Sequence, residues 1–181
     1  MNRIVILGTG HATVTRCYNT CFVLQTDTTT LLVDAGGGNG ILQRLKQAGI
    51  AIKDLHHMYV THAHTDHILG TSWVIRMVLS AAGYEGRFHV YSHAKVLRVI
   101  SMICGETLSA KHRRLMGERV VMHEVGDGTG FNVGDIGMQS FDIHSKKELQ
   151  YGFRATLPGG AVVVCLGDEP YNPLSRRYAE G

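Results

Sequence analysis

Short apolar runs separated by polar, turn-rich segments make up the first third of the chain, a pattern typical of successive strands. The runs that predict strands are residues 3–7, 21–25, 31–33 and 58–60. Before the last of them, Ile41, Leu42 and Leu45 recur at helical spacing between Asn39, which predicts a helix N-cap, and Gly49, which predicts its end. The chain is therefore expected to begin with a sheet and to add its first helix before the fourth strand.

The middle of the chain alternates between predicted helices and strands. Apolar residues between Trp73 and Ala81 recur at helical spacing, and Gly83 ends the run. A strand is expected at residues 88–91, and Ser92 after it is expected to cap another helix. This alternation is typical of an α/β protein.

Near Gly117 the pattern changes to strands joined by glycine turns. The predicted strands are residues 120–123, 136–143, 151–157 and 161–166. The third is half-buried by its alternation, with Phe153 and Ala155 on one face and Arg154 and Thr156 on the other. Strands with helices on both outer faces suit an α/β sandwich, and residues 1–181 are expected to form a single domain.

Composition excludes a disordered chain. Of the 181 residues, 44% are hydrophobic and 18% charged, with 22 glycines and 3 prolines, which is the balance of a globular enzyme. The net charge of +3 is mildly permissive of anionic substrates. The basic residues are too few and too scattered for a convincing nucleic-acid footprint.

The first apolar run is too short for a signal peptide, and no stretch approaches the roughly 20 apolar residues of a membrane span. The four cysteines form no CxxC pair and lie in ordinary apolar contexts. We therefore expect a cytoplasmic protein with free thiols and no membrane partner.

The residues that carry chemistry follow directly after the strand at 58–60. Within six positions lie His62, His64, Asp66 and His67. Imidazole and carboxylate groups both bind zinc-like metals at about 2.0 to 2.2 Å, and a tight loop can direct alternate side chains at two ions. His62 and His64 are expected to share one ion, while Asp66 and His67 face a second ion and the substrate. His56 and His57, on the preceding strand edge, are expected to be structural.

These four residues match the HxHxDH signature completely, and the chain resembles the metallo-β-lactamase superfamily. The resemblance covers essentially the whole chain through ordered landmarks, which are LGTG, LLVDAGGG, THAHTDH, a later lone histidine and LGDEP. Within the superfamily the chain is most similar to the ribonuclease Z branch. The resemblance implies an αββα sandwich and a site for two divalent metal ions, with zinc first and manganese or iron as alternatives.

The resemblance also implies roles for residues outside the histidine cluster. His144 would be the third histidine of the first metal, and Asp168 the carboxylate that bridges both ions. Asp34 would hydrogen-bond the loop that carries the ligands. His144 and Asp168 each follow a predicted strand, where a sheet edge can present a ligand.

Two features depart from the family pattern. A further metal-binding histidine is expected beyond the GD motif, but the sequence ends at Gly181, so the second half of the fold is expected to be incomplete here. A longer native chain or another subunit would supply that histidine, and a homodimer stays open. Only 23 residues separate His144 from Asp168, which is too few for the arm that grips transfer RNA, so transfer RNA is not expected as a substrate.

The leading functional hypothesis is a metal-dependent hydrolase of phosphodiesters that uses a metal-bound hydroxide, with Asp66 as the catalytic residue that orients the water or accepts its proton. The expected substrate is a small anionic ester, which Lys146 and Lys147 would steer toward the ions. Two alternatives remain. One is a lactone, thioester or sulfate-ester hydrolase of the same fold, and the other is a metal-bound sensor module without turnover.

Overall fold

Two β-sheets pack face to face, with helices on their outer sides. The computed structural model describes residues 1–168 and 172–179. The strands are β1 (Arg3–Gly8), β2 (Cys21–Gln25), β3 (Thr30–Val33), β4 (His57–Tyr59), β5 (Phe88–Ser92), β6 (Val120–Glu124), β7 (Gly130–Val133), β8 (Ile136–Asp142), β9 (Tyr151–Thr156) and β10 (Val162–Cys165). The α-helices are α1 (Gly40–Gln47), α2 (Thr65–Ser80), α3 (Ala94–Thr107), α4 (Ala110–Arg113) and α5 (Arg176–Ala179). Short 3₁₀ turns cover Ile52–Asp54 and Pro173–Ser175.

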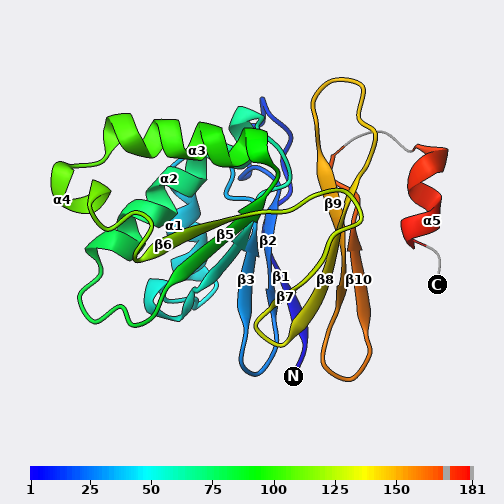
Figure 1. Ribbon diagram of the computed structural model, residues 1–181, viewed down its shortest axis with the longest axis horizontal. Helices are drawn as coiled ribbons and strands as arrows, with labels where there is room; N and C mark the ends of the chain where they lie inside the picture. Colours follow the sequence, from blue (N-terminus) through cyan, green and yellow to red (C-terminus); the bar gives the residue numbers. More distant parts are fainter. Residues whose placement is uncertain (169–171, 180–181) are drawn as a thin grey trace.

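The layers confirm the predicted αββα sandwich. Helices α1, α2 and α3 lie on one side of the six-stranded sheet β1-β2-β3-β4-β5-β6, and the four-stranded sheet β10-β9-β8-β7 faces its other side (Figure 1). Helix α5 lies beyond the second sheet, where Tyr178 stacks on Phe141 of β8. Strands β3 to β6 run parallel, whereas β1, β2 and the whole second sheet pair antiparallel.

One apolar core lies between the helices and the first sheet, and another lies between the two sheets. Between helices and sheet, α1 buries Ile41 and Leu45, and the helix ends before Gly49, whose φ of +71° favours glycine. Between the two sheets, Tyr59 of β4 meets Phe153 of β9 edge to face, with ring centroids 5.0 Å apart. The predicted alternation in β9 is confirmed, since Phe153 and Ala155 are fully buried.

Three details differ from the sequence-based expectation. The predicted cap Ser92 is wrong, because its hydroxyl donates to the Val60 carbonyl and His93 takes the N-cap position of α3. Strand β7 was not predicted, because its segment is rich in glycine and has few apolar positions. Helix α2 begins at Thr65, so Asp66 and His67 lie in its first turn.

No helix in residues 1–168 and 172–179 is long and apolar enough to cross a membrane. In the LGDEP landmark, Glu169 and Pro170 lie outside the described residues, as do Tyr171, Glu180 and Gly181.

Candidate metal centre

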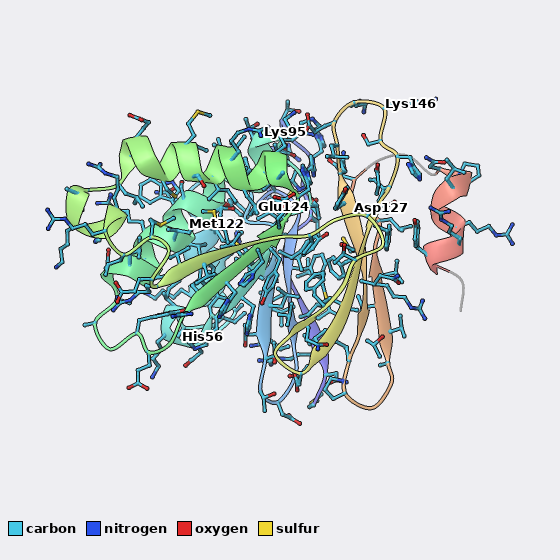
Figure 2. The ribbon with its side chains drawn as sticks, in the orientation of Figure 1. His56, Lys95, Met122, Glu124, Asp127 and Lys146 are labelled. Atoms are coloured by element: carbon cyan, nitrogen blue, oxygen red, sulfur yellow. The ribbon has the colours of Figure 1, made fainter. Side chains whose placement is uncertain are left out.

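The histidine cluster lies at the edge of the six-stranded sheet where its parallel strands end. Asp34 follows β3, and Thr61 to His64 connect β4 to α2. Asp168 reaches the same edge from the second sheet, three residues after β10. Lys95 and Lys146 lie at this edge as well, at the top of the molecule in Figure 2. The topology therefore brings residues separated by more than 100 positions to one place.

Five side chains form two overlapping groups of candidate metal ligands. The first group is His62, His64 and Asp168, and the second is Asp66, His67 and Asp168. Within each group the ligand atoms lie within 4.8 Å of one another. Asp168 belongs to both groups, so its carboxylate is placed between His62 and His64 on one side and Asp66 and His67 on the other.

The distances suit coordination of two ions. In the first group, His62 Nε2 lies 2.9 Å from His64 Nδ1 and 3.7 Å from Asp168 Oδ1. In the second, His67 Nε2 lies 3.5 Å from Asp66 Oδ2 and 3.3 Å from Asp168 Oδ2. Ligand atoms about 2.0 to 2.2 Å from one tetrahedral ion are roughly 3.3 to 3.6 Å apart, so small side-chain movements suffice for both groups.

Asp34 and Thr61 determine that the Nδ1 atoms of His62 and His67 carry a proton. Its carboxylate accepts from the Thr61 backbone N–H, from the Thr61 hydroxyl and from His67 Nδ1, each at 2.8 Å. Because the Thr61 hydroxyl proton is used on Asp34, its oxygen must accept the 2.9 Å hydrogen bond from His62 Nδ1. His62 and His67 therefore both hold the Nδ1 proton, and their Nε2 atoms are oriented toward Asp168.

Burial and neighbouring carboxylates shift the pKa values of His62 and His67 in opposite directions. Burial, with a further contribution from nearby His67, lowers the pKa of His62 to about 4. Burial opposes charge on His67 too, but hydrogen bonds to Asp168 and Asp34 outweigh it and raise the pKa to about 10. The same hydrogen bond from His67 holds the pKa of the Asp168 carboxyl well below its usual range. A metal at His67 would therefore have to displace the Nε2 proton.

His144 lies near this edge but in neither ligand group among the described residues. It is exposed, its φ is +57°, and its backbone N–H donates to Asp142 Oδ1 at 2.7 Å. A positive φ is uncommon for histidine, and here the Asp142 side chain supports the turn. The role of His144 as a metal ligand stays a prediction.

An open cavity of about 500 Å³ adjoins the cluster and is bordered by His64, Asp66 and Asp168. Lys147 lines it, whereas the predicted substrate-binding residue Lys146 is not among the lining residues and extends from the tip of the β8–β9 loop (Figure 2). A second cavity of about 380 Å³ also includes Asp66 and continues along Tyr18, Asn19 and residues 37–40.

His11 in the cavity wall was missed by the sequence-based reasoning. Strand β1 is antiparallel to β2, which is antiparallel to β3, so β1 and β3 run in the same direction. The loop after β1 must therefore reach the same edge as Asp34. The shared direction of β1 and β3 was the signal that could have placed His11 at the edge of the sheet that carries the cluster.

Residues 2–164 of the chain match the family described as Anti-Pycsar protein Apyc1. The chain belongs to this family. The match includes the whole HxHxDH segment and His144, and it ends four residues before Asp168.

Curated relatives of this Apyc1-family chain include ribonuclease Z proteins. The chain is 37% identical to ribonuclease Z of Streptomyces avermitilis over 79 residues, which is 43% of the chain and 26% of that protein. It is 30% identical to ribonuclease Z of Aeropyrum pernix over 141 residues, which is 77% of the chain and 42% of that protein. The chain thus spans less than half the length of these relatives.

Solved structures show the same fold at low identity. The metallo-β-lactamase fold protein YhfI from Bacillus subtilis is 17% identical, with a TM-score of 0.76 over 98% of this chain and 67% of YhfI. The short form of human tRNase Z, ELAC1, is 17% identical, with a TM-score of 0.73 over 93% of this chain and 69% of that chain. The predicted metallo-β-lactamase fold of the ribonuclease Z-like kind is confirmed.

Asp34→Asn should weaken metal binding by this Apyc1-family protein roughly 10- to 100-fold, because an amide offers one acceptor oxygen where three donors converge. Asparagine tolerates the φ of +55° at this position, so the backbone is preserved. Zinc affinity measured by competition with a chromophoric chelator checks the expectation. Asp135→Asn is the matched control, since Asp135 also accepts from threonine hydroxyls but lies in an exposed turn. Equal zinc affinity in the two variants would contradict the role of Asp34.

Proposed function

We propose that this Apyc1-family protein is a metal-dependent hydrolase of phosphodiesters that holds two divalent ions at the cluster. The observation that carries the proposal is the position of Asp168, whose two oxygens lie 3.7 Å from His62 and 3.3 Å from His67. One carboxylate that reaches a histidine of each ligand group is placed to bridge two ions. Zinc is the expected metal because imidazole and carboxylate are its usual ligands, with manganese or iron as alternatives.

When bound, the ions would supply an activated water and neutralise negative charge on a phosphoryl group. The chain itself contributes orientation and proton transfer. Asp66 is the best placed general base, because it lies in the first turn of α2 at the cluster and borders both cavities. Its side chain is only 10% exposed, so competing bulk water has limited access to it.

A small anionic ester is the proposed substrate. The cavity of about 500 Å³ has the size of a small-molecule site, and the exposed ammonium group of Lys147 lies at its wall. Relatives named ribonuclease Z and tRNase Z also make transfer RNA a candidate substrate. The short connection between His144 and Asp168 argues against it, because it leaves no room for a long RNA-gripping arm.

A substrate panel tests the proposal. The purified protein, supplied with zinc or manganese, should hydrolyse bis(p-nitrophenyl) phosphate or a cyclic nucleotide. Asp66→Ala should lower this rate on the order of 10²-fold or more through loss of the base and a metal ligand. Asp54→Ala, which removes an exposed aspartate from the 3₁₀ turn before β4, at the other end of that strand from the cluster, should keep the rate.

The same panel separates the alternatives. Turnover only of a lactone, a thioester or a sulfate ester would replace the phosphodiester with another substrate class on the same fold. Cleavage only of precursor transfer RNA would contradict the small-ester proposal. Metal binding without turnover of any substrate, and without a difference between the wild type and Asp66→Ala, would identify a sensor module.

A further inference from the structure

A second histidine cluster lies on the inner face of the six-stranded sheet, away from the candidate metal centre. His57 on β4 is paired with His89 on β5, and Tyr91 on β5 is paired with His123 on β6. Since neighbouring residues in a parallel sheet point to the same face, three imidazoles from three adjacent strands share one surface. All three side chains are half-buried. We call His57, His89 and His123 the sheet-face histidines.

Two of these rings have nitrogen atoms close enough to bind the same metal ion. His89 Nδ1 lies 2.8 Å from His123 Nε2, where the two share one proton in a hydrogen bond. His57 is stacked on His89 with centroids 5.4 Å apart, and its Nδ1 is buried with no hydrogen-bond partner among the described residues. A buried imidazole nitrogen without a partner is costly unless a ligand or water satisfies it.

The aromatic neighbours hold this geometry in place. Tyr91 stacks on His123 with centroids 4.7 Å apart and on Phe131 of β7 at 5.3 Å. The imidazole of His123 is therefore fixed at the place where the second sheet begins to cover the first. A rigid ring pair loses little side-chain entropy when a ligand binds, which favours affinity.

The separation of 2.8 Å matches a particular coordination geometry. Two nitrogens in adjacent positions of a square-planar ion, each about 2.0 Å from it, are about 2.8 Å apart. Square-planar and tetragonal sites with nitrogen ligands are typical of Cu²⁺ and Ni²⁺, and Cu²⁺ has the highest affinity in the divalent series. A rotation of the rings that replaces the shared proton would direct both lone pairs to one ion.

We propose that His89 and His123 form a binding site for Cu²⁺ or a similar late transition-metal ion, separate from the candidate metal centre. Such an ion would cross-link β5 to β6, the edge strand of the sheet.

The neutral state of the sheet-face histidines favours metal binding, whereas a nearby positive charge opposes it. Burial lowers the pKa of all three histidines, that of His57 to about 4, so they are neutral and free to bind metal near pH 7. Arg87 also contributes to the lowered pKa of His89, and its positive charge would oppose a cation. The guanidinium group of Arg87 is exposed, so solvent and salt screen its repulsion of a cation. Coordination of Cu²⁺ by neutral imidazoles is expected to be stronger than this screened repulsion.

The site is distinct from the candidate metal centre by position. His57 begins β4 and precedes His62 by five residues, which corresponds to roughly 16 Å along an extended chain. His56, next to His57, is labelled in Figure 2 well below Lys95 and Lys146, in the lower part of the molecule. Neither group of ligands at the candidate metal centre includes a sheet-face histidine.

Copper titration of zinc-loaded protein tests the site without any activity assay. Up to one equivalent of Cu²⁺ should bind without releasing zinc, and its electron paramagnetic resonance spectrum should show two or more imidazole nitrogens. His89→Gln and His123→Gln should each lower the copper affinity roughly tenfold or more, since each removes one ligand. His56→Ala is the matched control, because His56 contacts Tyr84 instead and should leave copper binding unchanged.

Copper that binds only as zinc leaves, or a wild-type spectrum with fewer than two nitrogens, would overturn the proposal. Copper affinity that stays unchanged in both glutamine variants would also overturn it. Circular dichroism of each variant verifies folding, and the wild-type spectrum is decisive even where a variant fails to fold.

Discussion

Asp168→Asn should reduce the zinc bound per chain by at least half and lower phosphodiester hydrolysis on the order of 10³-fold. The reason is its shared position, since one side chain reaches both His62 and His67. Asparagine keeps the size of the side chain but provides one neutral oxygen in place of two charged ones. Metal analysis of the purified variant together with its rate on bis(p-nitrophenyl) phosphate measures both effects.

A matched control separates loss of the bridge from loss of any carboxylate. Asp135→Asn alters an exposed carboxylate that accepts from the hydroxyls of Thr26 and Thr28, and Asp135 is in neither ligand group. It should retain its zinc. If Asp168→Asn keeps the wild-type zinc content, Asp168 does not bridge two ions and the two-metal proposal is wrong.

Gly70→Ala should lower the free energy of unfolding by about 3 kcal/mol. Gly70 lies in α2, and a Cβ there would be 1.9 Å from the Ala35 carbonyl oxygen, which is backbone and has little freedom to move. The approach is fixed by two hydrogen bonds, from Gly70 N to Gly36 O at 2.9 Å and from Ala35 N to His67 O at 3.0 Å. Urea unfolding followed by circular dichroism measures the loss.

Gly105→Ala in α3 is the control for the helix itself. A Cβ at Gly105 has no heavy atom within 4 Å, so only the helix propensity changes. Alanine should therefore raise the free energy of unfolding by up to about 1 kcal/mol. If both alanine variants changed stability equally, close packing of α2 on the Ala35–Gly36 backbone would not explain the glycine.

The sequence predicted most strands, α1 and the cluster from His62 to His67, because each depends on residues close together in the chain. Apolar spacing determines which face of a strand or helix is buried, and the histidine motif is contiguous. Asp168 could be placed only through the family resemblance, since local pattern does not say that β10 ends beside β4. The structure brings it to the cluster.

The errors and omissions have tertiary causes. Ser92 has the composition of a helix cap, but a neighbouring strand offers its hydroxyl the Val60 carbonyl. Lys146 and Lys147 are equivalent in sequence, and the turn of the β8–β9 loop decides that Lys147 lines the cavity. The sheet-face histidines are spread over 67 positions of the chain, and only strand register reveals that they are neighbours.

The carboxylate of Asp34 ties together the ends of β3 and β4 and the start of α2, so five of the residues around the centre come from one stretch of about 35 residues. Among the described residues of the two ligand groups, Asp168 is the one that arrives from the other sheet. An ion bound by this stretch and by Asp168 would link the two sheets of the sandwich. Chelation should then make the second sheet susceptible to proteolysis well before the amino-terminal half is cut.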